Sequence, residues 1–384
     1  MIAALCLAVT VAYGALFYGF SVLVTQSAAG GEFSRGLLSA AYGGAVLTGG
    51  LAAIPVGRLA DRHGVRALIA GGALLGAAGL LGFAAATAGW QVLALWWLVL
   101  GPATAMTFYE PAYVAIQQAF AAEARPGAIA ALTLTAGLSG PVFIPATGAL
   151  VEALGWRDAT RVLAAAMACA APVALLLVRT TPPRAAPRAR RAWSPDLTPF
   201  RRPRLLLFTA GAVLGYGAIE AVVVHRVARF QELGFGLGTV TLWAGVSGLV
   251  TLPGRFLLPV AARRVRATAL LAGVLLVLAA STALMVSGSA YWQMALSFVL
   301  FGLVFGAALP LRAIVMGEWT ATAVFGAVMG VQAAAMAVGR AVAPAVTGAL
   351  HDALGGYTAA LALLCAMLAA AALLVLAAER RSSA

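Results

Sequence analysis

Residues 56–70 read VGRLADRHGVRALIA and hold five ionisable side chains within the nine positions from Arg58 to Arg66. The flanking stretches 37–55 and 67–86 contain no charged residue. A charged side chain inside a bilayer costs about 2.5–3.5 kcal/mol on insertion scales. The five groups therefore predict a turn outside the hydrocarbon, between two segments that cross it.

The composition agrees with a membrane protein. The chain has 384 residues, of which 63% are hydrophobic and 10% charged, whereas a soluble domain is about 25% charged. The net charge of +13 comes from arginines in short runs between apolar stretches, not from one basic face, so we expect no nucleic-acid partner. The three cysteines stand alone in apolar runs, which predicts neither a metal site nor a disulfide.

Interruptions of the apolar pattern, one of them after span 7 at Arg226–Glu232, predict twelve spans of roughly 20 residues each. The N-terminal apolar run is too long for a signal peptide, and we interpret it as a retained span. The longest interruption, residues 179–204, is rich in proline and arginine and predicts an exposed linker. The expected organisation is a six-helix bundle at 1–178, the linker 179–204 and a second six-helix bundle at 205–384.

The arginines also predict orientation. If even-numbered spans end inside, 19 of the 25 basic residues lie in inside loops and 6 on the other side. Basic residues near span ends favour the cytoplasm. We therefore expect a multi-pass protein of the cytoplasmic membrane with both termini and the linker inside.

The two predicted bundles share sequence. Residues 145–155 read PATGALVEALG and residues 344–355 read PAVTGALHDALG, so their TGAL cores start at 147 and 347, an offset of 200. Gly57-Arg58 and Gly254-Arg255 give an offset of 197. Two similar offsets predict two homologous halves, which enter the membrane in the same orientation because six spans is an even number. Parallel repeats of this kind are typical of one transporter architecture.

The turn GRLADRHGVR at 57–66 resembles the signature of the major facilitator superfamily between its second and third spans, and the resemblance covers essentially the whole chain. It implies an all-α fold of two parallel six-helix bundles around a central cavity. It also implies that this turn is a gate holding the cytoplasmic ends of the halves together. The gating turn would comprise Gly57, Arg58, Asp61, Arg62, Gly64 and Arg66. Only Asp61 has no counterpart in the second half, and we expect it near the N-terminus of span 11, at Thr320 or Thr322.

Within the superfamily, the chain resembles the branch of monocarboxylate porters and oxalate–formate antiporters. The resemblance lies in GEFSRGLLSAAY (31–42), FYEPAYVAIQQAF (108–120), GWR (155–157) and VHRVARFQELGFG (224–236). The chain departs from that branch at Ala12-Tyr13-Gly14 and in 242–254, where the branch has an acidic residue and a charged pair. Gly140-Pro141 partly resembles a motif of drug/proton antiporters.

Three charged residues inside predicted spans are candidates for substrate binding or proton coupling. Glu110 in span 4 is either such a group or an anchor for the bend at Pro111. Glu220 in span 7 shares a helical face with Tyr216 and suits reversible protonation, unless it lies close to the outer surface. Arg340 in span 11 is placed to hold an anion or to pair with Glu220, unless it reaches outward to the interface. We expect Arg312 in span 10 to be interfacial.

Aromatic residues one helical turn apart complete the candidate site. Tyr13 and Phe17 in span 1, and Tyr109 and Tyr113 in span 4, line a cavity or else pack in the core. No histidine has a second one at ligand spacing, and no phosphate-binding loop is present, so we expect no metal, no cofactor and no direct use of ATP.

The sequence thus predicts a secondary carrier, not an enzyme. Its expected partners are a small organic anion as substrate, the lipid bilayer and a proton as coupling ion, and we expect a monomer. Two alternatives are a proton-driven efflux pump for hydrophobic compounds and a membrane sensor that binds without transport.

Overall fold

The computed structural model describes residues 1–20, 22–23, 32–33, 35–178 and 198–380, so most of the predicted linker lies outside the described residues. The described residues form helices and contain no strand. Among the described residues, eleven helices or helix pairs are long and apolar enough to cross a membrane, and Ile2–Tyr18 is a shorter apolar helix. The predicted all-helical membrane fold is confirmed.

The chain folds into two compact units. Unit 1 comprises Met1–Pro195 and Gly317–Ala334, and unit 2 comprises Asp196–Met316 and Ala335–Ala384. The end of one helix from the second half of the sequence and the start of the next therefore belong to unit 1. Each unit is described on its own below.

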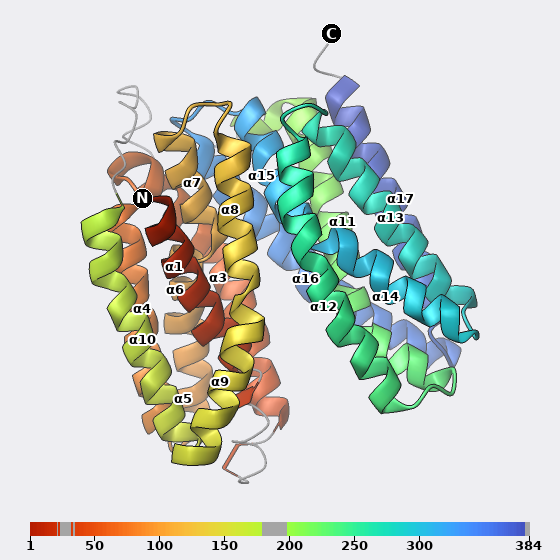
Figure 1. Cartoon of the computed structure of the whole chain (residues 1–384), viewed down its shortest axis with the longest axis horizontal. Coiled ribbons are helices and arrows are strands. Elements are labelled where there is room, and N and C mark those ends of the chain that lie inside the picture. Colours follow the sequence, from red (N-terminus) through yellow and green to blue (C-terminus); the bar gives the residue numbers. More distant parts are fainter. Residues whose placement is uncertain (21, 24–31, 34, 179–197, 381–384) are drawn as a thin grey trace. The chain divides into compact units, whose positions relative to one another are not determined.

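Unit 1 is an all-helical bundle in which α10 lies along α4 and α1 contacts α8 (Figure 1). Its helices are α1 (Ile2–Tyr13), η1 (Gly14–Tyr18), α3 (Arg35–His63), α4 (Arg66–Ala85), α5 (Gly89–Leu95), η2 (Trp96–Leu100), α6 (Gly101–Thr107), α7 (Tyr109–Ala119), α8 (Arg125–Gly137), α9 (Ser139–Leu154) and α10 (Trp156–Leu177). The short elements η1 and η2 are π-helical turns, which interrupt spans 1 and 4. Such turns inside α-helices are frequent at functional sites.

Unit 2 is built in the same manner, with α17 packed against both α11 and α13 (Figure 1). Its elements are η4 (Thr198–Arg201), α11 (Pro203–Glu232), α12 (Leu237–Ala261), α13 (Ala267–Ser287), α14 (Tyr291–Phe305), α15 (Ala308–Trp319), α16 (Phe325–Leu354) and α17 (Thr358–Arg380). The last residues of α15 and the first ten of α16 are those counted with unit 1.

Glycines end equivalent helices in the two halves. Gly155 follows α9 with φ +80° and Gly355 follows α16 with φ +70°. Only glycine adopts this conformation without strain. The two residues stand at the ends of the repeated segments PATGALVEALG and PAVTGALHDALG, so the repeat read from the sequence recurs in the backbone.

Spans 4 and 10 are both broken at equivalent places. Span 4 leaves the helical conformation at Phe108, where ψ is −155°, and span 10 is interrupted between Phe305 and Ala308. Pro111 is the third residue of α7, and Pro310 is the third residue of α15. Proline lacks an N–H and clashes with the carbonyl four residues earlier, so a continuous helix is disfavoured in both spans.

One predicted boundary differs from the structure. The charged residues Arg226, Arg229 and Glu232 predicted an interruption after span 7, but α11 continues to Glu232. The helix persists because Arg229 is buried and bonds to α13, and Arg226 lies against α14. Charged side chains with partners inside the unit do not require a turn.

Candidate functional site

Asp61 lies in the last turn of α3 and caps the N-terminus of α16 within unit 1. Its Oδ1 accepts a hydrogen bond from the Gly326 N–H at 2.9 Å, and its Oδ2 accepts one from the Ala327 N–H at 2.8 Å. The carboxylate is only 5% exposed. A carboxylate at a helix N-terminus satisfies two of the free N–H groups and interacts favourably with the helix dipole. The structure thus places Asp61 at the helix expected from the sequence, on Gly326 and Ala327, not on Thr320 or Thr322.

Glycines allow α3 and α16 to approach at this point. A Cβ on Gly57 would meet the carbonyl oxygen of Gly326, and a Cβ on Gly326 would lie 2.8 Å from Asp61 Oδ1. One turn further, a Cβ on Gly330 would meet the carbonyl oxygen of Ala53. The Asp61 hydrogen bonds therefore depend on the absence of side chains along this crossing.

The other residues of the gating turn lie at the end of α3 and the start of α4. Arg58 and Arg62 are half-buried in the last two turns of α3, and Arg66 is exposed at the start of α4. Gly64 joins the two helices with φ +77°. Next to the turn, Gln117 of α7 donates to the Gly317 carbonyl at 3.1 Å, and Gln118 donates to the Ala60 carbonyl at 3.2 Å.

The candidate aromatic residues of spans 1 and 4 form one cluster in unit 1. The Tyr13 ring stacks on Phe108, with centroids 3.9 Å apart, and lies 4.8 Å from Tyr109. Tyr109 stacks in turn on Tyr113 at 5.6 Å, and Phe17 meets Tyr13 edge-on at 6.2 Å. The structure therefore brings together all four predicted aromatic residues, and it adds Phe108, which the sequence did not single out. The break at Phe108 directs its ring to Tyr13.

Glu110 occupies the first turn of α7, directly after that break. It is half-buried beside the aromatic cluster. A carboxylate in the first turn of a helix is stabilised by the helix dipole, so this position suits an anchor for the bend as well as a functional group.

Glu220 and Arg340 form an ion pair in unit 2. Arg340 Nε of α16 lies 2.9 Å from Glu220 Oε2 of α11, and the side chains are 35% and 31% exposed. The helices approach closely one turn earlier, where a Cβ on Gly217 would lie 3.0 Å from the Gly339 carbonyl oxygen. The pair is thus part of a tight helix crossing and remains accessible.

The first half lacks this pair. The segment YGAIE at 216–220 matches YGALF at 13–17, so Phe17 stands where the second half has Glu220. The position matching Arg340 lies near Pro141. Because the repeated fold forms without these charges in unit 1, the fold itself does not require them in unit 2.

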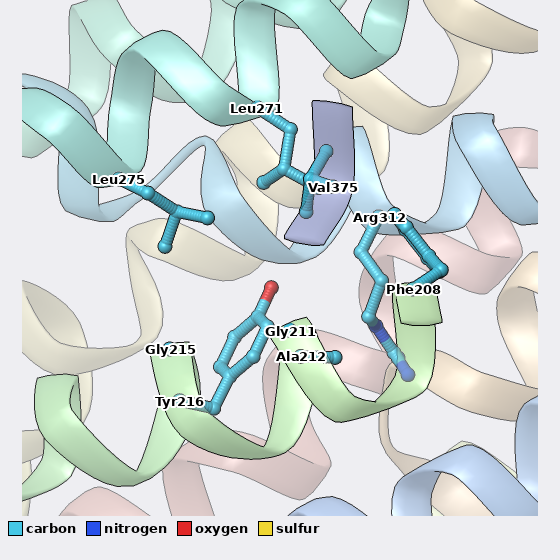
Figure 2. A pocket seen from close by; sticks show the side chains of 9 residues that line it. All are labelled: Phe208, Gly211, Ala212, Gly215, Tyr216, Leu271, Leu275, Arg312 and Val375. Atoms are coloured by element: carbon cyan, nitrogen blue, oxygen red, sulfur yellow. The ribbon is translucent and has the colours of Figure 1, made fainter. Parts of the chain in front are cut away.

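Tyr216 faces the interior of unit 2. It lines a cavity of about 10 Å³ together with residues of α11, α13, α15 and α17, a volume that holds about one water molecule. In Figure 2 its hydroxyl is directed toward Leu271 and Leu275, while Arg312 reaches the same region from α15.

Arg312 is fully buried, which corrects the expectation that it lies at the interface. Its Nη1 lies 3.4 Å from the Met336 sulfur. It stands two residues after Pro310, as the buried Tyr113 stands two residues after Pro111. Comparison of the two halves would have predicted its burial, whereas local hydropathy did not.

A second polar cluster, which the sequence did not predict, joins the ends of α11, α16 and α17. His225 contacts the Tyr357 hydroxyl through Nδ1 at 3.1 Å and the Pro344 carbonyl through Nε2 at 3.0 Å. A carbonyl only accepts, so Nε2 carries a hydrogen. His351 Nε2 lies 2.6 Å from Glu232 Oε1, and its ring lies 4.3 Å from that of Tyr357. In the described part of the chain, no three His, Cys, Asp or Glu side chains converge as metal ligands would.

Comparison with known proteins identifies the family. The model of the Major Facilitator Superfamily matches residues 5–289 and 228–384. The human organic anion transporter MFSD10 (TETRAN) has a similar structure, with a TM-score of 0.71 and 17% identity over 97% of this chain and 98% of that one. The E. coli fucose:proton symporter FucP, in a single-residue variant, gives a TM-score of 0.73 and 14% identity over 99% of this chain and 98% of that one. A structure of FucP in the outward conformation gives a TM-score of 0.75 with the same identity and coverage. A search of curated proteins found no match.

The family match spans both units and agrees with the turn at 57–66, the twofold repeat and the twelve-span pattern. At these identities, the likeness to solved structures concerns the fold. On the family match, the chain belongs to the major facilitator superfamily, whose members are membrane transporters.

Proposed function

We propose that this protein is a secondary active transporter of small organic anions such as monocarboxylates, working by alternating access and coupled to protons or to exchange. The observation that carries the proposal is the Glu220–Arg340 ion pair, 2.9 Å long and about one-third exposed. It places a carboxylate that can bind a proton beside a guanidinium that can bind an anion, and both groups lie inside predicted spans.

The pair offers a direct coupling mechanism. While Glu220 is ionised, it occupies the Arg340 guanidinium. When Glu220 takes up a proton, the ion pair is lost and Arg340 gains free N–H groups for a substrate carboxylate, which arginine binds in bidentate geometry. Release of the proton restores the pair and displaces the anion. Proton and substrate therefore bind together and leave together.

The gate proposal assigns a different role to Asp61. Its hydrogen bonds join α3 to the start of α16, and Arg340 lies further along the same continuous helix. Alternating access requires such a contact to break and re-form in each cycle. The contact therefore has to be specific, and it also has to be weak enough to open. Two charge-assisted hydrogen bonds from backbone N–H groups to one carboxylate meet both requirements.

Two structural neighbours agree with this proposal in their descriptions, one as an organic anion transporter and the other as a fucose:proton symporter.

The test is uptake into proteoliposomes. The purified protein is reconstituted, a pH gradient is imposed, and uptake of radiolabelled acetate, lactate, benzoate and succinate is followed. We expect gradient-driven uptake of at least one carboxylate and its loss in Glu220→Gln, because a glutamine cannot exchange a proton. Glu152→Gln, which changes an exposed carboxylate in α9, is the matched control and should transport normally. Gradient-driven uptake by Glu220→Gln at the wild-type rate would contradict the assignment of the proton site.

The aromatic cluster around Tyr13 favours a second candidate, a proton-driven efflux pump for hydrophobic compounds. Stacked rings bind apolar molecules without a charge. That function predicts extrusion of a hydrophobic dye, no flux of any carboxylate and little dependence on Arg340. The same vesicles distinguish the two, and binding without any flux would indicate a sensor.

A further inference from the structure

Arg226 occupies an unusual environment in unit 2. It lies in α11 directly after His225, but the two side chains face different neighbours. His225 contacts α16 and Tyr357, whereas Arg226 lies against α12 and α14. Its Cζ is 5.2 Å from the Phe298 ring centroid and 5.0 Å from that of Phe301, and its Nη1 is 3.5 Å from Ser247 Oγ. Both rings and the serine are buried.

The neighbouring Arg229 shows what a structural arginine looks like in this helix. Its Nε and Nη2 donate to the carbonyls of Met285 and Val286 at 3.0 Å each, at the end of α13. Its Nη1 lies 3.7 Å from Glu232 Oε2. Arg229 therefore ties α11 to α13 and uses its donors inside the protein.

Arg226 uses its donors very little. In the described part of the chain, the serine contact at 3.5 Å is its one polar contact, and no carboxylate approaches it. The two acids of α11 are engaged elsewhere, Glu220 with Arg340 and Glu232 with His351. A guanidinium has five N–H donors, and it remains charged inside proteins. The charge is stabilised by the two ring faces, while the N–H edges are left for another group.

We propose that Arg226, supported by Phe298 and Phe301, is the first binding point for the carboxylate of the transported anion, occupied while ionised Glu220 still holds Arg340. The inference rests on the proposed function and specifies its substrate class as organic monocarboxylates. The rings stabilise the guanidinium charge, and one edge of a guanidinium offers two parallel N–H groups at the spacing of carboxylate oxygens. The Ser247 hydroxyl is placed to donate a further hydrogen bond.

The ion pairs of α11 near Arg226 favour a monoanion. Glu220 and Arg340 neutralise each other, as do Glu232 and Arg229 at the end of α11. Neither acid compensates Arg226, which leaves one positive charge at its own site beside α12 and α14. One carboxylate removes it, whereas a dianion would leave one negative charge in the same low-dielectric place.

The test measures the apparent affinity for a named probe. Uptake of radiolabelled benzoate into proteoliposomes is measured for the wild type, Arg226→Gln, Arg226→Lys and Arg264→Gln, with benzamide as the uncharged competitor. Arg264 is exposed in the turn after α12, so Arg264→Gln removes the same charge away from the site. We expect Arg226→Gln to raise the KM for benzoate about tenfold to a hundredfold, the loss that a charge-assisted hydrogen bond predicts.

Arg226→Lys keeps the charge but not the bidentate edge, so its KM should lie between those of wild type and Arg226→Gln. Benzamide should compete poorly with benzoate in the wild type, and this preference for the charged ligand should shrink in Arg226→Gln. A purely structural arginine would lower the amount of active protein without changing that preference. If Arg226→Gln does not fold, the KM of Arg226→Lys for benzoate in the same assay tests the proposal: a raised KM supports it and an unchanged KM contradicts it.

The outcomes separate the two proposals. An unchanged KM and an unchanged preference for benzoate in the Arg226 variants, with a wild type that transports it and depends on Glu220, would overturn the Arg226 site alone. A wild type that transports none of the carboxylates overturns the proposed function and this inference together.

Discussion

Asp61 connects two parts of the chain that are 265 residues apart. The neighbouring arginines are sufficiently explained by the preference of basic residues for the cytoplasmic side. Orientation does not explain a buried carboxylate that accepts two backbone hydrogen bonds. The side chain that is unmatched in the sequence repeat is therefore also the one with a specific long-range partner.

Asp61→Asn tests that partner. An asparagine retains one acceptor oxygen, while its NH₂ group faces the second N–H, so one hydrogen bond is lost and an N–H is left unsatisfied. This costs about 1–3 kcal/mol, which corresponds to a population of the closed contact that is smaller by about fivefold to 150-fold. We expect normal membrane insertion and a transport rate reduced by about tenfold.

Asp158→Asn is the matched control. Asp158 pairs with Arg161 on the exposed surface of α10, and exposed pairs contribute little. Its transport should equal that of the wild type. Equal transport by Asp61→Asn in the same vesicles would show that Asp61 does not act as a gate.

The crossing of α3 and α16 depends on glycine as much as on Asp61. At Gly57 the added carbon would meet the backbone of α16, which cannot move aside as a flexible side chain can. Small residues that let helix backbones approach are typical of membrane helix interfaces. The close helix crossing and the Asp61 cap therefore depend on each other, since the hydrogen bonds to Gly326 and Ala327 form only when α3 and α16 lie close together.

Gly57→Ala should separate the helices and disrupt the Asp61 contacts. We expect lower thermal stability of the purified protein and transport reduced at least as much as in Asp61→Asn. Gly273→Ala in α13 adds the same methyl group where no atom lies within 4 Å. Alanine favours the helix over glycine, so this control should be neutral or slightly stabilised. The same response from both variants would contradict the role of this crossing.

The two halves share a plan but differ in chemistry. Both have a broken span before a proline and a helix that ends at a positive-φ glycine. Unit 1 places an aromatic cluster around Tyr13 and Phe17, whereas unit 2 has the Glu220–Arg340 pair in span 7 and span 11. A duplicated scaffold thus supports an apolar, aromatic surface in one unit and charged groups in the other.

The orientation of the chain is testable on intact cells. In a background with Cys6, Cys169 and Cys365 replaced by alanine, single cysteines are introduced as Arg264→Cys and Ser289→Cys. These positions are exposed on either side of α13. The distribution of arginines predicts that a membrane-impermeant maleimide labels Ser289→Cys in intact cells and Arg264→Cys only after lysis. The reverse pattern would show that the termini lie outside.

The amino-acid sequence was sufficient for the all-helical membrane fold, the twofold repeat, the bend at Pro111 and the signature at 57–66. These features depend on hydropathy over about 20 residues and on local backbone preferences, which neighbouring residues determine. It also singled out Glu220 and Arg340, because a charge in an apolar stretch is conspicuous, and Asp61, because the second half has no acid that matches it.

Only the tertiary structure showed which groups meet. Asp61 binds the start of α16, Glu220 pairs with Arg340, and Arg226 and Arg312 face the interior of unit 2 when their charge had suggested a loop and an interface. Hydropathy averages over all directions around a helix, so it does not specify which way a side chain points. That direction is set by the packing of helices that are distant in the sequence, and it decides whether a charge is a topological signal or part of a site.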